Sequence, residues 1–261
     1  MGKCQTVKRF DRKTITSGPI TKYSRLEGDV VTGLDFSSAL FRRRRRVCSD
    51  FEFIRCSFDN YTVAARADLA NRPVIRNCRV VDCSVHATYL NGAVVEDTII
   101  DGLGTSARTH LLVFGAVFKH VTLRGKLGTL ISRPYTHLFD DEGHPERDDQ
   151  FKQANAAYYA QVDWALDIRE AEAAELTLIG VPANLIRRDP ATQAVVRRAA
   201  VADGKWKAID LGKAYWHITI QEMLDGGFED VVLVSPRRSV NYAAGVRGIE
   251  ILRSERIADP D

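Results

Sequence analysis

The densest charge in the chain is a run of five consecutive arginines. Guanidinium groups repel one another unless they are solvated or paired with an anion, and they form paired hydrogen bonds with carboxylates and phosphates. The run is therefore the predicted partner-binding site, facing an acidic or phosphate-bearing protein, and the alternative is a solvated loop. Its members are Arg42, Arg43, Arg44, Arg45 and Arg46.

The histidines and carboxylates match no metal or catalytic motif. No two histidines have the H-x-x-x-H or H-E-x-x-H spacing of a zinc site, so the sequence predicts no metal site, no cofactor and no catalytic residue. Two groups of polar residues nevertheless leave an enzyme, for example a carbohydrate-active one, as the alternative function. They are a staggered acidic column of Asp59, Asp82 and Asp101, and a polar loop with His137, Asp140, Asp141 and His144.

The cysteines indicate a reducing compartment. There are five of them, an odd number, and no two show the C-x-x-C spacing of redox or zinc sites. The sequence thus favours a cytoplasmic location with unpaired thiols. The five are Cys4, Cys48, Cys56, Cys78 and Cys83.

The composition is that of a globular chain with a nearly balanced charge. It has 261 residues, 45% of them hydrophobic, and a formal net charge of +3 from 37 basic and 34 acidic residues. This charge is too small to predict strong binding to duplex DNA. The apolar run Leu111–Phe118 is far shorter than the roughly 20 residues of a membrane-spanning helix, so no membrane partner is expected. The Arg-rich and Ala-rich composition is typical of bacteria.

An internal repeat predicts the elements that position these residues. Aligned segments share an apolar residue, a small or apolar residue three positions later, and an apolar residue two positions after that. They begin at Val31, Phe53, Ile75, Val95 and Phe118, which are 22, 22, 20 and 23 residues apart. Within them a finer step of five appears, and residues 166–185 divide into four pentads. A step of five fits neither a strand nor a helix, and predicts a chain that turns a corner every five residues.

Three pentads give this pattern a family resemblance. Thr98–Gly102, Val121–Gly125 and Leu176–Gly180 resemble the pentapeptide-repeat family, whose motif is roughly [STAV]-[DN]-[LF]-[STR]-G. The resemblance implies a right-handed quadrilateral parallel β-helix with two residues per side pointing inward. Cys56, Cys78 and Cys83 then occupy the small inward position and are expected to be buried.

The predicted fold is mainly β, with a helical insertion and a C-terminal α/β cap. A lead-in at 1–28 precedes β-helix coils at 29–133, a loop and helix insertion at 134–163, a further coil at 164–186, and the cap at 187–261. The insertion helix is expected at 148–162, and cap helices at 191–202, 215–224 and 240–252. A short buried strand is expected at 231–234. Trp164, Trp206 and Trp216 are expected to be packing anchors.

The favoured function is a non-catalytic, protein-binding β-helix, because a rigid repeat scaffold docks a partner at little ordering cost. The family resemblance also implies candidate roles as a bacterial toxin-neutralising or effector-scaffold protein. Family members that mimic DNA require a strongly acidic surface, which this chain lacks.

Overall fold

The computed structural model describes residues 25–27, 30–32, 47–59, 62–63, 68–105, 110–134 and 145–260. The predicted arginine site at 42–46 and the polar loop with His137, Asp140, Asp141 and His144 lie outside these residues. Within them the protein is mainly β, as predicted, and is built on parallel strands. No described helix is long and apolar enough to cross a membrane.

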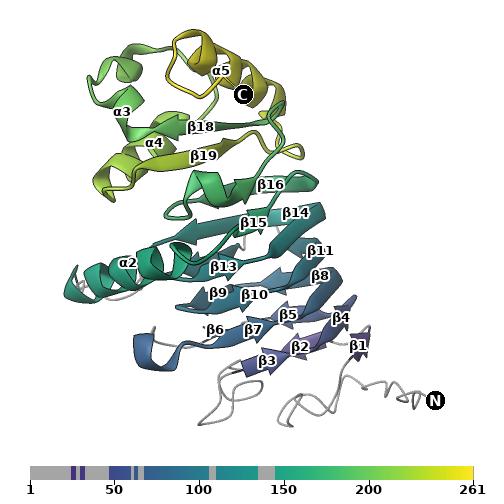
Figure 1. The fold of residues 1–261 in the computed structure, drawn as a ribbon. Helices are drawn as coiled ribbons and strands as arrows, with labels where there is room; N and C mark the ends of the chain where they lie inside the picture. Colours follow the sequence, from purple (N-terminus) through teal and green to yellow (C-terminus); the bar gives the residue numbers. More distant parts are fainter. Residues whose placement is uncertain are drawn as a thin grey trace.

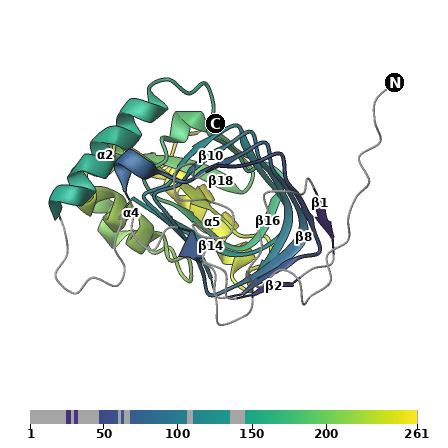
Figure 2. The same cartoon turned by 90° about the horizontal axis from the view of Figure 1, so that it is seen from below.

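The parallel strands form one curled sheet and a four-stranded companion (Figure 1). The 13-stranded sheet contains β1 (Arg25–Glu27), β2 (Val30–Thr32), β4 (Glu52–Ile54), β5 (Ser57–Asp59), β6 (Thr62–Val63), β8 (Arg79–His86), β9 (Thr88–Asn91), β11 (Ile99–Thr105), β12 (Leu111–Phe114), β14 (Val121–Arg133), β15 (Leu166–Asp167), β16 (Ala171–Leu178) and β17 (Ile186–Arg187). The companion contains β3 (Val47–Ser49), β7 (Val74–Arg76), β10 (Val94–Glu96) and β13 (Val117–Lys119). Seen end on, these strands surround a common axis (Figure 2).

The strand register shows where the chain returns to the same side. Phe53 pairs with Val80, Val80 with Ile100, and Ile100 with Leu123. The steps are therefore 27 (80 minus 53), 20 (100 minus 80) and 23 (123 minus 100) residues. Each circuit of the chain stacks on the one before.

The predicted alignment of the repeat is right in its later part and wrong at its start. Ile75, Val95 and Phe118 do lie in one column. Phe53, however, pairs with Val80 rather than Ile75, and Val31 pairs with Phe58. The early circuits are 27 residues long because the chain makes an extra excursion, including the 3₁₀ turn at Leu69–Asn71, before returning.

Burial follows the step of five residues. In the last full circuit, pairs of buried side chains recur every five residues, while intervening residues such as Arg169, Glu170 and Glu175 are exposed. The predicted small inward cysteines are likewise buried, at 1% exposure for Cys56 and 3% for Cys78. The buried pairs are Leu166/Ile168, Ala171/Ala173, Leu176/Leu178 and Val181/Ala183.

Left-handed residues turn the chain at the corners. Asp50, Asn77, Asp97 and His120 have φ between 47° and 64°. The backbone amide of each of these residues donates a hydrogen bond to a carbonyl of the next circuit, for example Asn77 N to Glu96 O (3.1 Å). Asp, Asn and His tolerate this conformation better than other residues with a Cβ atom, which explains why polar residues stack at this corner.

Helix α2 (Pro145–Tyr159) confirms the predicted insertion helix and packs on the flank of the strands. Phe151, Asn155 and Tyr159 form its buried face. Asn155 accepts a hydrogen bond from the Arg72 guanidinium (2.9 Å), which also donates to the carbonyls of Gly92 (2.7 Å) and Gly115 (2.8 Å). This Arg72 clamp fastens the insertion to a corner of the sheet.

The cap covers the C-terminal end of the curled sheet (Figure 1). The 3₁₀ turn η3 (Ala183–Leu185) still belongs to the last circuit, and the cap that follows contains the 3₁₀ turn η4 (Lys205–Ala208), the strands β18 (Gln193–Arg197) and β19 (Asp230–Val234), and the helices α3 (Arg198–Val201), α4 (Trp216–Asp225) and α5 (Tyr242–Ser254). The antiparallel pair β18–β19 lies between two apolar cores. Val195, Val232 and Val234 join the core of the curled sheet, whereas Val231 and Leu233 join the core of the cap.

One cap prediction is wrong and three are confirmed. The helix predicted at 191–202 is a turn, then strand β18, then the short α3. Asp189 accepts hydrogen bonds from Ala191 N (3.1 Å) and Thr192 Oγ1 (2.9 Å), which closes a turn instead of starting a helix. Residues 193–196 are all buried, and successive side chains point to different cores: Ala194 and Val196 join the core of the cap and Val195 the core of the curled sheet, as in a strand. The predicted helices at 215–224 and 240–252 and the strand at 231–234 are present as α4, α5 and β19.

Candidate functional site

A cleft of about 400 Å³ lies where the last circuit meets the cap. We call it the junction cleft. One wall is strand β16 at residues 174–177, and another is β19 at residues 232–234. The remaining lining comes from Arg133 of β14, from residues 213–219 at the start of helix α4, and from residues 236–245 around the start of α5. The elements that meet here are thus far apart in the sequence.

The β16 wall is a strand edge. Among the described strands, β16 pairs only with β14, and β19 only with β18. Neighbouring residues of a strand direct their backbone groups to opposite sides, and Ala173 O accepts a hydrogen bond from Arg238 N of the cap (3.0 Å). The amides and carbonyls of Glu175 and Thr177 therefore also face the cap side. Glu175 is exposed and Thr177 half-buried, so a ligand can reach this edge.

Exposed apolar side chains gather at the mouth of the junction cleft. Five large apolar side chains are exposed in the described part of the chain, and two of them, Tyr215 at 69% and Ile218 at 59%, line this cleft. Val240, which is fully exposed, borders an adjoining hollow that shares Lys213 and Asn241 with the cleft. Exposed apolar groups around a concave surface are typical of a binding site.

The polar lining of the junction cleft is sparse and mixed in charge. Arg133 Nη2 contacts Glu222 Oε1 at 3.0 Å and so ties β14 to α4, while Glu222 Oε2 is buried without a partner among the described residues. Lys213 and Glu175 lie exposed on the lining with opposite charges. The cleft is therefore suited to a polar main chain rather than to a highly charged ligand.

Tight glycine packing fixes the wall formed by α5. A Cβ atom on Gly245 would lie 2.4 Å from Ser235 Oγ, and one on Gly248 would lie 2.8 Å from the Trp216 ring. Both distances are too short for any larger residue. Helix α5 can therefore approach β19 and α4 closely only because these positions are glycines.

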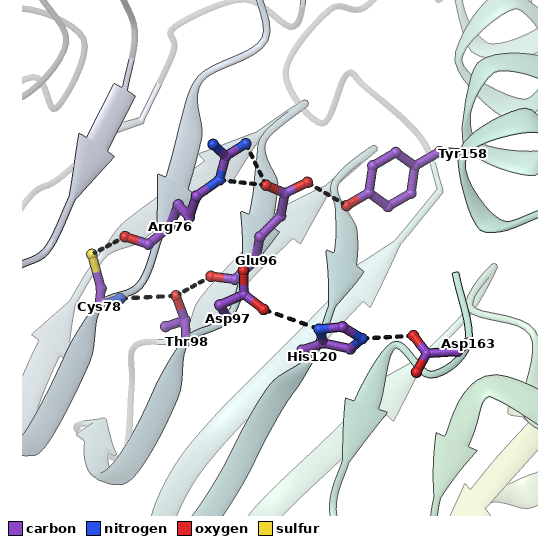
Figure 3. Close-up of polar contacts among 8 residues, drawn as sticks. All are labelled: Arg76, Cys78, Glu96, Asp97, Thr98, His120, Tyr158 and Asp163. Atoms are coloured by element: carbon purple, nitrogen blue, oxygen red, sulfur yellow. Dashed lines mark hydrogen bonds and ion pairs between the residues drawn. The ribbon is translucent and has the colours of Figure 1, made fainter. Parts of the chain in front are cut away.

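A second polar cluster joins a corner of the curled sheet to the insertion (Figure 3). His120 Nδ1 lies 3.0 Å from Asp97 Oδ1, and His120 Nε2 lies 2.6 Å from Asp163 Oδ1. Beside them, Glu96 accepts hydrogen bonds from Arg76 (2.7 Å) and from the Tyr158 hydroxyl of α2 (2.9 Å). We call Asp97, His120 and Asp163 the corner triad.

The corner triad favours a charged imidazole. The hydrogen bond that His120 donates to Asp163, aided by Asp97, raises the pKa of His120 above its usual value. The same hydrogen bond lowers the pKa of Asp163. Both ring nitrogens are occupied by carboxylates, so neither is free to act as a base. This geometry favours a clasp over a catalytic centre.

Of the residues predicted as sites, Asp82 and Asp101 are those whose side chains the structure describes, and they lie on the neighbouring strands β8 and β11. Asp101 forms an ion pair with Arg124 (2.8 Å). It lies in register with Val81, so Asp82 is offset from Asp101 by one position, which agrees with the predicted stagger of the acidic column. The side chain of Asp59 lies outside the described residues. Among the residues that are described, no group of histidines, cysteines and carboxylates forms a metal site.

Sequence reasoning missed the junction cleft. Trp216 was expected to be a packing anchor, which its 7% exposure confirms, but its exposed neighbour Tyr215 was not singled out. No motif marks Lys213, Tyr215 or Ile218, because they become neighbours of β16 only through the tertiary fold. Comparisons with protein-family models, curated proteins and solved structures find no match to this chain.

Proposed function

We propose that the curled sheet is a right-handed quadrilateral parallel β-helix of the pentapeptide-repeat type. The burial of two side chains per five residues supports this, as do left-handed corners at Asp50, Asn77 and Asp97 and circuits of 20 to 27 residues. A cytoplasmic setting agrees with the cysteines at positions 48, 56, 78 and 83, none of which forms a disulfide.

We further propose that the protein is a non-catalytic binding protein whose junction cleft takes an extended segment of a partner protein. The observation that carries the proposal is the accessible β16 edge beside exposed apolar side chains in a cleft of about 400 Å³. Main-chain hydrogen bonds to Glu175 and Thr177 would supply affinity, because an added strand satisfies an open edge. Tyr215 and Ile218 would select the side chains of the segment.

The rigidity of the scaffold supports this role. The curled sheet is held to the cap by the ion pair Arg133–Glu222 and by Arg238, which donates to Leu127 O at 2.8 Å as well as to Ala173 O. A preformed cleft loses little conformational entropy when a partner binds. The arginine run at 42–46 is proposed as an additional contact with an acidic or phosphate-bearing partner.

A peptide selection tests the cleft. Random decapeptides displayed on phage would be selected on the immobilised full chain, and the enriched peptides measured in solution. Their affinity should fall at least about tenfold in Ile218→Glu, because this change places a charge where an apolar contact is expected. N-methylation of alternate peptide amides should weaken binding for one set of positions and not for the other, because only one set faces β16.

The matched control is Ile99→Glu, at an apolar residue of β11 that is 37% exposed and is not part of the cleft lining. It should leave peptide affinity unchanged. Enriched peptides that ignore Ile218→Glu, or that bind equally well with either set of amides methylated, would refute docking on the β16 edge.

A further inference from the structure

The interior of the curled sheet contains a cavity of about 140 Å³. Its lining runs from Phe53 in β4 to Leu166 in β15, with side chains from every circuit between them. The cavity explains why inward residues such as Ile75, Val80 and Ile100 are only partly buried although they pack on the core. Protein interiors are normally close-packed, so this space is unusual.

The polar atoms of the lining are turned away from this space. Thr88 Oγ1 lies 3.2 Å from Phe58 O, and Thr98 Oγ1 donates to Glu96 O at 2.7 Å. The Cys78 thiol donates to Arg76 O at 3.3 Å. The remaining lining residues are Val, Ile, Leu, Phe and Cys. A water molecule needs two to four polar partners, so the cavity is dry.

The sequence accounts for the cavity through the size of the inward residues. The repeat places Val or Ile at inward central positions where the pentapeptide motif has Leu or Phe. Val80, Val85, Val95, Ile100 and Val113 are all of this kind and all line the cavity. Each shorter side chain leaves space along the axis, and because the circuits stack, the spaces join.

The lining of the cavity extends along the axis of the curled sheet. Its lining spans β4, β8, β11, β14 and β15, which are consecutive neighbours in the sheet. Neighbouring strands lie about 4.8 Å apart, so four steps span about 19 Å. A volume of about 140 Å³ spread over this length suits a thin, flexible molecule better than a wide ring.

We propose that this interior cavity binds a linear aliphatic chain, such as the alkyl part of a fatty alcohol or an acyl group. The dry lining offers dispersion contacts along the whole ligand. A linear chain fills the length of the cavity without displacing the large side chains of Phe53 and Phe118. The site is separate from the junction cleft, and no step of peptide docking depends on it.

Octan-1-ol is the test ligand and cyclooctanol the control of similar carbon content. With the methyl groups of the full-length protein isotopically labelled, NMR should show octan-1-ol contacts to Ile75 and Ile100 and none to the surface residue Ile218. Cyclooctanol should bind at least about tenfold more weakly. Xenon, which enters dry cavities, should perturb the same methyl groups.

Filling the cavity provides the second measurement. Val80→Phe and Ile75→Phe should each weaken octan-1-ol binding at least about tenfold, whereas Val81→Phe, on the outward neighbour, should not. Two different filling variants guard against one that fails to fold. The proposal is overturned by octan-1-ol contacts outside the core, by equal binding of cyclooctanol, or by xenon binding without octan-1-ol binding.

Discussion

The curled sheet and the cap are built on opposite principles. In the curled sheet each inward residue has an equivalent one circuit away, as Cys48, Ile75, Val95 and Phe118 do in one column. In the cap no position repeats, and the core forms where β18, β19, α4 and α5 converge. The regular region supplies rigidity, whereas the irregular region supplies the concave surface with exposed apolar groups. The junction of the two regions is therefore where we propose that a partner binds.

The largest expected effect is on the periodic core. Phe53→Asp should prevent folding, because Phe53 is 3% exposed and the change buries an unpaired charge, at a cost above about 4 kcal/mol. Arg55→Asp, two residues away, should cost less than about 1 kcal/mol, because Arg55 is exposed at a left-handed corner with φ 52° that Asp tolerates. Urea unfolding followed by circular dichroism compares the two. Similar midpoints would mean that the inward register is wrong.

The next effect concerns the insertion. Arg72→Ala should cost about 2–3 kcal/mol, because the carbonyls of Gly92 and Gly115 lose a charged donor in a partly buried site. Asn155→Ala should cost less, and the double variant should cost less than the sum of the two, because Arg72 and Asn155 share one network. The readout is the free energy of unfolding for the four proteins of the cycle. Strict additivity would show that the Arg72 clamp does not exist.

The sequence predicted the periodic region better than the cap. Cys56, Cys78 and Cys83 were placed correctly because a step of five is visible without any tertiary information. The register of Phe53 failed because loop residues can be added at a corner without changing the local pattern. In the cap, the apolar run 194–196 fits a helix or a strand equally well, and only the cores on both sides decide. The junction cleft could not be predicted, since its lining comes from β14, β16, β19 and the residues around the starts of α4 and α5, which are far apart in the sequence.

A smaller effect is expected from the arginine run. Replacing Arg42, Arg44 and Arg46 with Gln should leave the unfolding midpoint unchanged and weaken binding of an acidic peptide or a phosphopeptide. The loss should shrink as salt rises, because ions screen exposed charges. Fluorescence anisotropy at several salt concentrations measures it. Equal affinity of both proteins at low salt would leave the run as a solvated loop.

The smallest effect is the pH response of the corner triad. The raised pKa of His120 means that its contribution is complete below the unfolded-state value of about 6.5 and disappears as the pH rises through the folded-state value. The lowered pKa of Asp163 means that its contribution is present above about 3.9 and is lost as the pH falls through its folded-state value. Because these groups are largely exposed, the stability change should be small.

NMR titration of His120 gives a direct readout. Asp163→Asn should bring the pKa of His120 down towards about 6.5, and Asp97→Asn should do so to a lesser extent, because Asp163 makes the shorter hydrogen bond. A His120 pKa that is the same in all three proteins would show that the clasp is absent.

Residue-resolved amide hydrogen exchange at the β16 edge tests the central claim most directly. In the free protein the amides of Glu175 and Thr177 should exchange quickly, whereas that of Leu176, which faces β14, should exchange slowly. Addition of a selected peptide should slow exchange at Glu175 and Thr177 and leave Leu176 unchanged. Fast exchange at both edge residues in the saturated complex would contradict docking by strand addition.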